Sequence, residues 1–291
     1  MNQDELARSI GKALGESFQI DSLSNIGGGC ISSAARIESQ GRDYFIKFNR
    51  ADLLEMFEAE AEGLQAMAEA KAVRVPRPLT TGISDGQAYL VMEYLETGGS
   101  GDMARFGEQL AQMHRHTQEQ FGWHRDNTIG STPQPNGWYS DWIHFWQEQR
   151  LGFQLELALR NGAGKVLYDR GQDLKLRVGD FFQDYQPVAS VLHGDLWSGN
   201  YAFTHDGEAV IFDPAVYYGD READLAMTEL FGGFSRSFYS GYDAAWPIDP
   251  GYSVRKTFYN LYHILNHYNL FGGGYASQAR RMIDQLLGEL D

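Results

Sequence analysis

The sequence predicts an α+β protein with two lobes, a small antiparallel sheet followed by a larger helical part. Its 291 residues exceed a typical domain of about 100–200 residues, which leaves either two lobes or one large α/β unit. The pattern changes near residue 95 from short strand-like runs to long helical stretches, which favours two lobes, at 1–95 and 96–291. With 43% apolar and 22% charged residues the chain can bury a core, which excludes disorder.

The first lobe is expected to contain a small antiparallel sheet and one long helix. Glycine-rich and polar turns separate four strand-like runs, at 20–26, 33–38, 44–48 and 88–92. A stretch rich in Glu, Ala, Leu and Met at 51–70 predicts the helix, which ends before Pro76.

The second lobe is expected to be mainly helical. Apolar residues recur every three or four positions in four stretches, at 103–117, 139–161, 174–185 and 255–269. Short apolar runs at 191–192 and 210–212 predict two strands around a loop. The cleft between two such lobes is the expected ligand site.

The charge and the cysteine content limit the binding partners and the cellular compartment that we expect for this protein. The formal net charge of −15 disfavours nucleic acid and anionic membranes as partners. No apolar run approaches the roughly 18–20 residues that a membrane span requires. The acidic first five residues lack the order of an export signal, and the single cysteine, Cys30, cannot form an internal disulfide, so we expect a cytoplasmic protein.

The strongest chemical signal is the segment 193–200, His-Gly-Asp-Leu-Trp-Ser-Gly-Asn, together with Asp213 at the end of an apolar run. An Asp, an Asn five residues later and a second Asp are the groups that phosphoryl transfer from Mg-ATP requires. We assign Asp195 as the base that accepts the hydroxyl proton, and Asn200 and Asp213 as magnesium ligands. Either half alone fits a tight turn capped by an Asx side chain, but the two together favour catalysis.

Lys47 lies in a strand-like run, Tyr-Phe-Ile-Lys-Phe, where a charge requires a partner. Strand alternation places Phe45 and Lys47 on one face of the sheet. Glu60 lies midway between Met56 and Leu64 at four-residue spacing, on the apolar face of the following helix, so we expect it to hold Lys47 for the ATP phosphates. The alternative is a lysine that snorkels over solvated glutamates.

Two further backbone segments are expected to bind ATP. A glycine-rich turn precedes the lysine strand, and its amides can approach the phosphates closely, although such a turn serves structure equally well. The residues of this turn are Gly27, Gly28, Gly29, Cys30 and Ile31. At the lobe junction a hinge can pair its backbone with the adenine edge, and it consists of Met92, Glu93, Tyr94 and Leu95.

These motifs carry a resemblance to the fructosamine kinase (ketosamine-3-kinase) family, relatives of the aminoglycoside phosphotransferases. It rests on 193–200, Asp-Pro-Ala at 213–215, Tyr-Gly-Asp-Arg-Glu-Ala-Asp-Leu-Ala at 218–226 and the glycine-rich turn. Phe-Gly-Trp at 121–123, the run 127–134, Arg-Leu at 150–151, Leu-Asn at 265–266 and Phe-Gly at 271–272 agree with it, so the match covers most of the chain.

The resemblance implies a protein-kinase-like fold and a phosphotransferase with an alcohol acceptor. The expected reaction is ATP-dependent phosphorylation of the sugar 3-hydroxyl of ketosamines, small or protein-bound, after which the adduct decomposes and releases the amine. Protein kinases instead carry His-Arg-Asp and Asp-Phe-Gly at the catalytic positions, and no Ala-Pro-Glu motif follows here, so a protein kinase is disfavoured. The family often has His where this chain has Asp220, while Glu222 and Asp224 match its acids; we expect Asp224 to brace the catalytic loop.

Two residues have open alternatives. Trp197 can stack on a sugar ring, which the resemblance supports, or pack the catalytic loop onto the helical lobe. Cys30 is either a small apolar filler or an oxidisable thiolate near Lys47. The resemblance also implies a redox switch through an intermolecular disulfide at Cys30, so a monomer and a Cys30-linked dimer both remain open.

Two other functions compete with the ketosamine kinase. One is a kinase of another hydroxylated amine, such as an aminoglycoside, choline or an amino sugar, because the fold does not specify the acceptor. The other is a nucleotide-binding pseudokinase that regulates a partner. The presence of every expected catalytic position, from Lys47 to Asp213, disfavours it.

Overall fold

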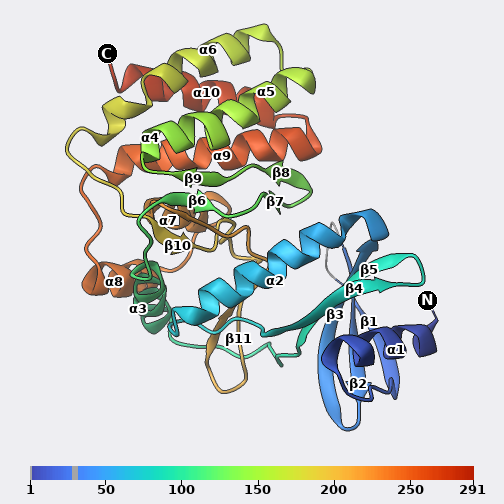
Figure 1. Ribbon diagram of the computed structural model, residues 1–291. Helices are drawn as coiled ribbons and strands as arrows, with labels where there is room; N and C mark the ends of the chain where they lie inside the picture. Colours follow the sequence, from blue (N-terminus) through green and yellow to red (C-terminus); the bar gives the residue numbers. More distant parts are fainter. Residues whose placement is uncertain (1, 28–31) are drawn as a thin grey trace. The chain divides into compact units, whose positions relative to one another are not determined.

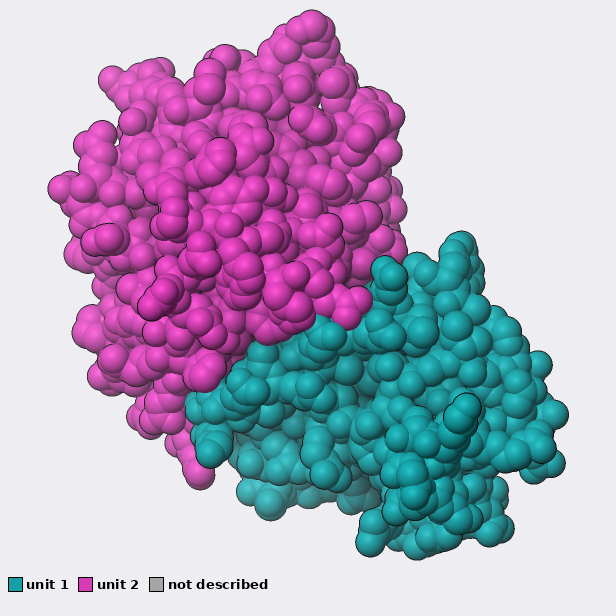
Figure 2. Space-filling view, viewed as in Figure 1, with its two compact units in different colours: residues 1–101, 201–213 teal, residues 102–200, 214–291 magenta. Residues whose placement is uncertain are grey.

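The computed structural model describes residues 2–27 and 32–291 (Figure 1). These residues form two compact units, coloured separately in Figure 2. The first, here the sheet unit, comprises residues up to Gly101 together with Tyr201–Asp213, and the second, the helical unit, comprises Asp102–Asn200 and Pro214–Asp291. The boundary expected between residues 95 and 96 stays a prediction, and 201–213, expected in the helical lobe, packs within the sheet unit.

Among the described residues, the sheet unit contains a five-stranded antiparallel sheet in the order β1-β2-β3-β5-β4. Its strands are β1 (Ser22–Ile26), β2 (Ser33–Ser39), β3 (Arg42–Arg50), β4 (Pro78–Ser84) and β5 (Gln87–Glu93). All four predicted strands are present, with ends shifted by a few residues. Strand β4 was not predicted: it begins at a proline and has a register shift between Pro78 and Thr80, both of which an edge strand tolerates.

The sheet is covered on one face by α1 (Gln3–Leu14), a helix that was not predicted. Asn2 caps its first turn and Gly15, in the left-handed conformation, ends it. Leu6 and Ile10 are fully buried in one cluster with residues of β2, β3 and β5. The predicted helix at 51–70 is present as a 3₁₀ turn (Ala51–Leu53) followed by α2 (Leu54–Glu69).

A hairpin from the second half of the sequence completes the sheet unit. Strands β11 (Tyr201–Phe203) and β12 (Ala209–Ile211) pair with each other. The amide of Ile211 donates to the carbonyl of Arg74 at 3.0 Å, and the amide of Gly98 donates to the carbonyl of Phe203 at 3.0 Å. The apolar run at 210–212 was expected as a strand, but β11 was missed.

The helical unit is built mostly from helices. These are α3 (Met103–His114), α4 (Trp142–Phe145), a π-helical segment (Trp146–Gly152), α5 (Phe153–Arg160), α6 (Lys165–Leu176), α7 (Glu222–Leu230), α8 (Arg236–Ala245), α9 (Tyr252–Phe271) and α10 (Tyr275–Gly288). A sheet of short strands accompanies them, in the order β10 (Ser190–Leu192), β13 (Tyr217–Gly219), β6 (Phe121–Trp123), β9 (Gly137–Tyr139). The hairpin β7 (Asn127–Ile129) and β8 (Thr132–Gln134) stands apart from it.

One predicted helix is wrong. Residues 174–185 were expected as a continuous helix, but α6 ends at Leu176 and a 3₁₀ helix follows (Val178–Phe182). Val178, Phe181 and Phe182 are buried, so their three- and four-residue spacing is satisfied by the tighter 3₁₀ turn. The other three predicted helices of this unit are present.

Helices α3 and α8 approach each other closely through glycine. A Cβ on Gly107 would lie 2.0 Å from the carbonyl oxygen of Phe238, and one on Gly241 would lie 2.0 Å from that of Ala104. Only glycine allows this backbone contact. Among the helices in the described part of the chain, none combines the length and apolar character that a bilayer crossing requires.

Candidate active site

In the sheet unit, Lys47 on β3 lies between two carboxylates. Its Nζ donates to Oε1 of Glu60 on α2 at 2.5 Å and to Oδ1 of Asp213 at 2.6 Å. Lys47 pairs with Ala34 on β2 and Leu90 on β5, so it occupies the centre of the sheet. The structure therefore contains the ion pair with Glu60 that the helix spacing predicted; its role in nucleotide binding stays a prediction.

The charges of this cluster are strongly coupled. Burial alone would lower the pKa of Lys47, but the carboxylates of Glu60 and Asp213 outweigh it and raise the pKa well above its ordinary value. Burial, aided by Asp213, raises the pKa of Glu60 while Lys47 opposes it. Lys47 is therefore a fixed cation at neutral pH, as a phosphate-binding residue must be.

Asp213 is the last residue of the segment Tyr201–Asp213, which belongs to the sheet unit. It follows β12 by two residues and has a φ of 57°, in the left-handed region that Asp tolerates better than most residues. Its side chain is 49% exposed, compared with 12% for Lys47 and for Glu60. The carboxylate is thus bound by Lys47 and half exposed to solvent.

In the helical unit, Asn200 binds Asp195. Asn200 is buried, and its Nδ2 donates to the carbonyl oxygen of Asp195 at 2.8 Å and to Oδ2 of the same residue at 3.4 Å. The amide of Asp195 donates to Nδ1 of His193 at 3.2 Å. Because the amide nitrogen of Asn200 is used on Asp195, its oxygen is the atom suited to a metal ion.

Asp224 on α7 braces this loop, as the sequence led us to expect. The amide of His193 donates to its Oδ2 at 2.7 Å and the amide of Gly194 to its Oδ1 at 2.8 Å. Nε2 of His114 lies 3.1 Å from Oδ2, and Nδ1 of His114 lies 2.8 Å from the hydroxyl of Tyr242. Burial raises the pKa of Asp224, but His114, His193 and the Gly194 amide together lower it below its ordinary value.

Ala215, which follows Asp213 and Pro214, is hydrogen-bonded to the loop that contains His193 and Asp195. The amide of Ala215 donates to the carbonyl of His193 at 2.8 Å. Gly194 has a φ of 82°, and a Cβ there would lie 2.1 Å from the carbonyl oxygen of Ala215. Glycine is therefore required at position 194 by both its conformation and this contact.

Trp197 shows features of both of its alternatives. Its side chain is 38% exposed, with an edge contact to Phe231 at 6.5 Å between ring centroids. A Cβ on Gly199 would lie 2.3 Å from the indole, so Gly199 makes the space in which the ring packs. The indole is thus packed on the loop and still presents a surface to solvent.

Asp220 and Glu222, which are close to Asp224 in the sequence, form a buried acidic group. Asp220 accepts bonds from the hydroxyls of Tyr259 and Tyr185, and Glu222 forms a two-point ion pair with Arg255. Burial raises the pKa of both carboxyls, that of Glu222 to about 7. Asp220 is therefore a structural acceptor in this chain.

The expected nucleotide-binding backbone is only partly described. Gly28, Gly29, Cys30 and Ile31 lie outside the described residues, so the predictions for them stay predictions. Gly27 follows β1 and is exposed.

At the expected hinge, Met92 is buried at the end of β5, and Tyr94 and Leu95 are half-buried. The carboxylate of Glu93 pairs with Arg74 and accepts from the amide of Arg77. The side chain of Glu93 is thus committed to structure, which leaves the backbone of this segment as its expected ligand-binding group.

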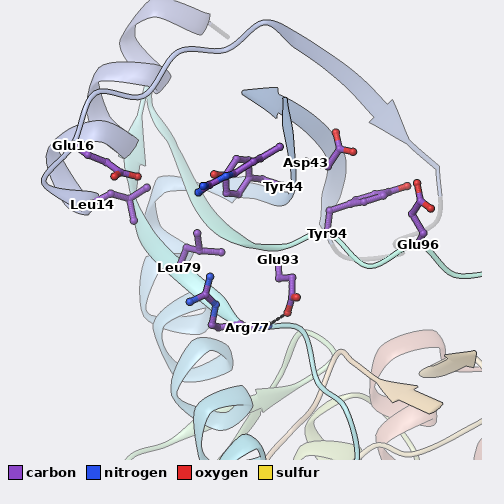
Figure 3. A pocket seen from close by; sticks show the side chains of 10 residues that line it. Leu14, Glu16, Asp43, Tyr44, Arg77, Leu79, Glu93, Tyr94 and Glu96 are labelled. Atoms are coloured by element: carbon purple, nitrogen blue, oxygen red, sulfur yellow. Dashed lines mark hydrogen bonds between the residues drawn. The ribbon is translucent and has the colours of Figure 1, made fainter. Parts of the chain in front are cut away.

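An open cavity of about 560 Å³ lies in the sheet unit, and Glu93 and Tyr94 of the expected hinge are among the residues that line it (Figure 3). Lys47, Glu60 and Asp213 are not among them. Tyr44, Leu79 and Leu14 line it, and the same residues pack against the buried cluster beneath α1. Tyr44 and Lys47 point to opposite faces of β3 by strand alternation. This cavity is therefore separate from the candidate phosphate site.

The five predicted catalytic and metal-binding residues divide between the two units. Lys47, Glu60 and Asp213 come together in the sheet unit, and Asp195 and Asn200 in the helical unit. Sequence reasoning missed His114 on α3, which bonds to Asp224, and Tyr242 on α8, which bonds to His114. Their only signal was the apolar periodicity around them, and that pattern does not identify a buried polar contact.

Comparison with known proteins finds matches over nearly the whole chain. The family model described as fructosamine kinase matches residues 2–289. A probable ketoamine kinase of Synechocystis is 49% identical, over 97% of this chain and 96% of its own length. The chloroplastic protein-ribulosamine 3-kinase of Arabidopsis thaliana is 45% identical, over 94% of this chain and 85% of its own.

Solved structures agree on the fold. A Haemophilus somnus protein provisionally named a fructosamine-3-kinase has a TM-score of 0.88 at 29% identity, covering 98% of this chain and 97% of its own. An aminoglycoside phosphotransferase has a TM-score of 0.62 at 15% identity, covering 99% of both chains, and this likeness concerns the fold alone. The α+β, kinase-like fold expected from the sequence is confirmed.

Proposed function

Because this chain belongs to the fructosamine kinase family, we propose that it transfers the γ-phosphoryl group of ATP to the sugar 3-hydroxyl of ketosamines. The observation that carries the proposal is Lys47 held at 2.5 Å from Glu60 and 2.6 Å from Asp213. A buried, permanently charged lysine next to a half-exposed carboxylate suits a magnesium-bound triphosphate.

Asp195 acts as the base in this proposal. The sugar 3-oxygen attacks the γ-phosphorus, its proton passes to the Asp195 carboxylate, and the bond from phosphorus to the ADP oxygen breaks. The products are the 3-phosphorylated ketosamine and ADP. The hydrogen bonds from Asn200 to Asp195 hold this loop in one conformation, and fixed positioning supplies much of the catalysis in phosphoryl transfer.

The residues present fit a magnesium ion. Mg²⁺ prefers oxygen ligands and is usually bound by one or two carboxylates plus substrate phosphates, not by a protein cage. Across residues 2–27 and 32–291, no group of three or more His, Cys, Asp or Glu side chains gathers as a metal site. The half-exposed Asp213 and the amide oxygen of Asn200 would hold the ion, which neutralises phosphate charge when bound.

Nucleotide binding in this proposal uses the sheet unit. Lys47 contacts the phosphates, the backbone of 92–95 pairs with the adenine edge, and the amides of 27–31 approach the phosphates. The kinase names of the relatives support ATP as the donor.

The acceptor is proposed from the relatives and from Trp197. The relatives are named ketoamine kinase and protein-ribulosamine 3-kinase, which supports sugar adducts of amines, small or protein-bound. The partly exposed indole of Trp197, two residues after Asp195, can stack on the sugar C–H groups. Because the phosphorylated adduct decomposes and frees the amine, the proposed role is deglycation in the cytoplasm.

The test is a turnover screen. ADP release is measured with fructosyl-, ribulosyl- and erythrulosyl-lysine as acceptors, with free lysine, choline and an aminoglycoside for comparison. We expect turnover of ketosamines and none of free lysine. Turnover of choline or the aminoglycoside without turnover of ketosamines would reassign the acceptor.

The role of Asp195 is tested by Asp195→Asn, which keeps the shape of the side chain and removes the base. We expect kcat to fall by at least about a hundredfold with ADP affinity within twofold of the parent. Asp206→Asn, an exposed carboxylate in the β11–β12 turn, is the control and should retain full activity. Parental turnover by Asp195→Asn would refute the assignment.

A further inference from the structure

Three amide side chains of the β7–β8 hairpin and the residues after it form a hydrogen-bonded group, here the amide cluster: Asn127, Gln134 and Asn136. Gln134 is 1% exposed and Asn136 is 3% exposed. Two members bind the chain that follows Asp213. Nε2 of Gln134 donates to the carbonyl of Ala215 at 3.0 Å, and Nδ2 of Asn127 donates to the carbonyl of Val216 at 2.8 Å.

The cluster is internally bonded, so its donors have fixed directions. Oδ1 of Asn127 accepts from Nε2 of Gln134 at 2.9 Å and from Nδ2 of Asn136 at 2.9 Å. Oδ1 of Asn136 in turn accepts from Nη2 of the fully buried Arg150 at 2.8 Å. A buried polar network whose members satisfy one another is rigid.

Tyr262 completes the network from α9. Its hydroxyl donates to Oε1 of Gln134 at 2.7 Å. Burial raises the pKa of Tyr262 to about 12, and the negative charge of Asp195 also acts on it. The hydroxyl therefore stays protonated and keeps the Gln134 amide nitrogen turned toward Ala215.

Ala215 links the cluster to the catalytic loop. Its carbonyl accepts from Gln134, while its amide donates to the carbonyl of His193, two residues before Asp195. Asp213 is two residues before Ala215 in the chain. One short backbone segment thus joins the candidate base and the candidate metal ligand, and the amide cluster fixes that segment.

Apolar side chains would stabilise a buried hairpin at least as well, because burying amides gains little net free energy even when they are bonded. What amides add is a fixed orientation of the backbone carbonyls to which they donate hydrogen bonds. Protein kinases have a long, mobile activation loop after the corresponding aspartate. Here the chain runs directly into β13 with two consecutive carbonyls bonded to side chains.

We propose that Gln134 and Asn127 are positioning residues for phosphoryl transfer, which hold the Ala215–Val216 backbone, and with it the Asp195 loop, in the conformation that a magnesium nucleotide requires. Neither side chain needs to touch the substrate. The effect on turnover rests on the proposed function, whereas the effect on metal-dependent nucleotide binding does not.

The experiment compares Gln134→Met with Gln147→Met. Gln147 is a matched control, because its Nε2 also donates to a backbone carbonyl of the helical unit, that of Lys175, at 2.7 Å. ADP affinity is measured by calorimetry with and without Mg²⁺, and kcat and KM with a ketosamine. Urea unfolding measures stability. Asn127→Ser, which removes the Val216 bond and the two bonds that Oδ1 of Asn127 accepts, is the second variant if Gln134→Met does not fold.

In the parent, Mg²⁺ should increase the affinity for ADP. In Gln134→Met we expect this increase to be smaller by about fivefold or more, while the affinity for ADP without Mg²⁺ stays within twofold of the parent. We expect kcat to fall about 10–100-fold, as small misplacements of reacting groups do, with KM for the ketosamine within twofold. Gln147→Met should lose stability only. Equal behaviour of the two variants, or no tightening by Mg²⁺ in the parent, would overturn the proposal. If the parent does not turn over ketosamines but Gln134→Met still loses the Mg²⁺ dependence of ADP binding, the proposed function is rejected and the positioning role is supported.

Discussion

The amide of His193 donates a 2.7 Å hydrogen bond to Oδ2 of Asp224, a carboxylate that is almost completely buried. The catalytic loop is therefore attached to α7 by an acceptor that has no access to water. This contact gives the carboxylate of Asp224 a structural role.

Asp224→Asn should lower both the stability of the protein and its kcat. An asparagine has one acceptor oxygen, so at least one of the His193 and Gly194 amides loses its partner, at about 1–3 kcal/mol. We expect a lower urea midpoint and a kcat reduced about tenfold or more. Asp243→Asn, where an exposed carboxylate accepts from the amide of Ile248, is the control. A parental kcat in Asp224→Asn would show that the loop does not need this brace.

Lys47→Met should weaken both nucleotide binding and folding, and a second change separates the two effects. The variant leaves Glu60 buried without its cation, which costs up to about 3–5 kcal/mol. Adding Glu60→Leu should restore much of the unfolding free energy, while ADP affinity stays at least tenfold below the parent. The exposed Lys12→Met should change neither. Calorimetry and urea unfolding measure both quantities, and parental ADP affinity in Lys47→Met would refute the phosphate role.

Glu222→Gln should remove a pH dependence of stability. Burial raises the pKa of Glu222 from 4.5 to about 7, so the folded protein favours the protonated carboxyl more than the unfolded chain does. Its contribution is complete below about pH 4.5 and is lost as the pH rises to 7, by at most about 1.4 kcal/mol per pH unit. Urea unfolding at pH 5, 6, 7 and 8 measures it.

Arg255 keeps Asp249 as a partner in that variant, so no cation is left unpaired. The unfolding free energy of Glu222→Gln should depend less on pH than that of the parent between pH 5 and 7. Parallel curves would mean that Glu222 is ionised throughout this range.

Gly107→Ala should destabilise the helical unit without a direct effect on the catalytic groups. The new methyl would lie 2.0 Å from the carbonyl oxygen of Phe238, so α3 and α8 must separate, at about 1–3 kcal/mol or more. Gly288→Ala, at the end of α10 with open space around it, is the control. Urea midpoints decide: equal values for the two variants would contradict the close helix contact.

The sequence predicted those parts in which pattern and chemistry point to the same residue. The alternation around Lys47 and the four-residue spacing around Glu60 together predicted an ion pair that the structure contains. By contrast, α1 was missed although Asn2, Leu6 and Ile10 mark it, because a short amphipathic run gives no chemical signal. Strand β4 was missed because Pro78 opens it.

Contacts between distant segments could not be predicted. Gln134 and Ala215 are 81 residues apart, and nothing local to either one indicates the other. The helix expected at 174–185 failed for a related reason: spacing alone does not distinguish an α-helix from the 3₁₀ turn at 178–182. Such features depend on tertiary packing.

The hairpin of β11 and β12 has a consequence for how the protein is made. The first compact unit includes Tyr201–Asp213, and Arg74 and Gly98 bond directly to that segment. During synthesis from the N-terminus, the sheet unit can therefore be completed only after the ribosome has added about a hundred residues beyond Gly101. A fragment cut at residue 101 would lack the segment that bonds to Arg74 and Gly98.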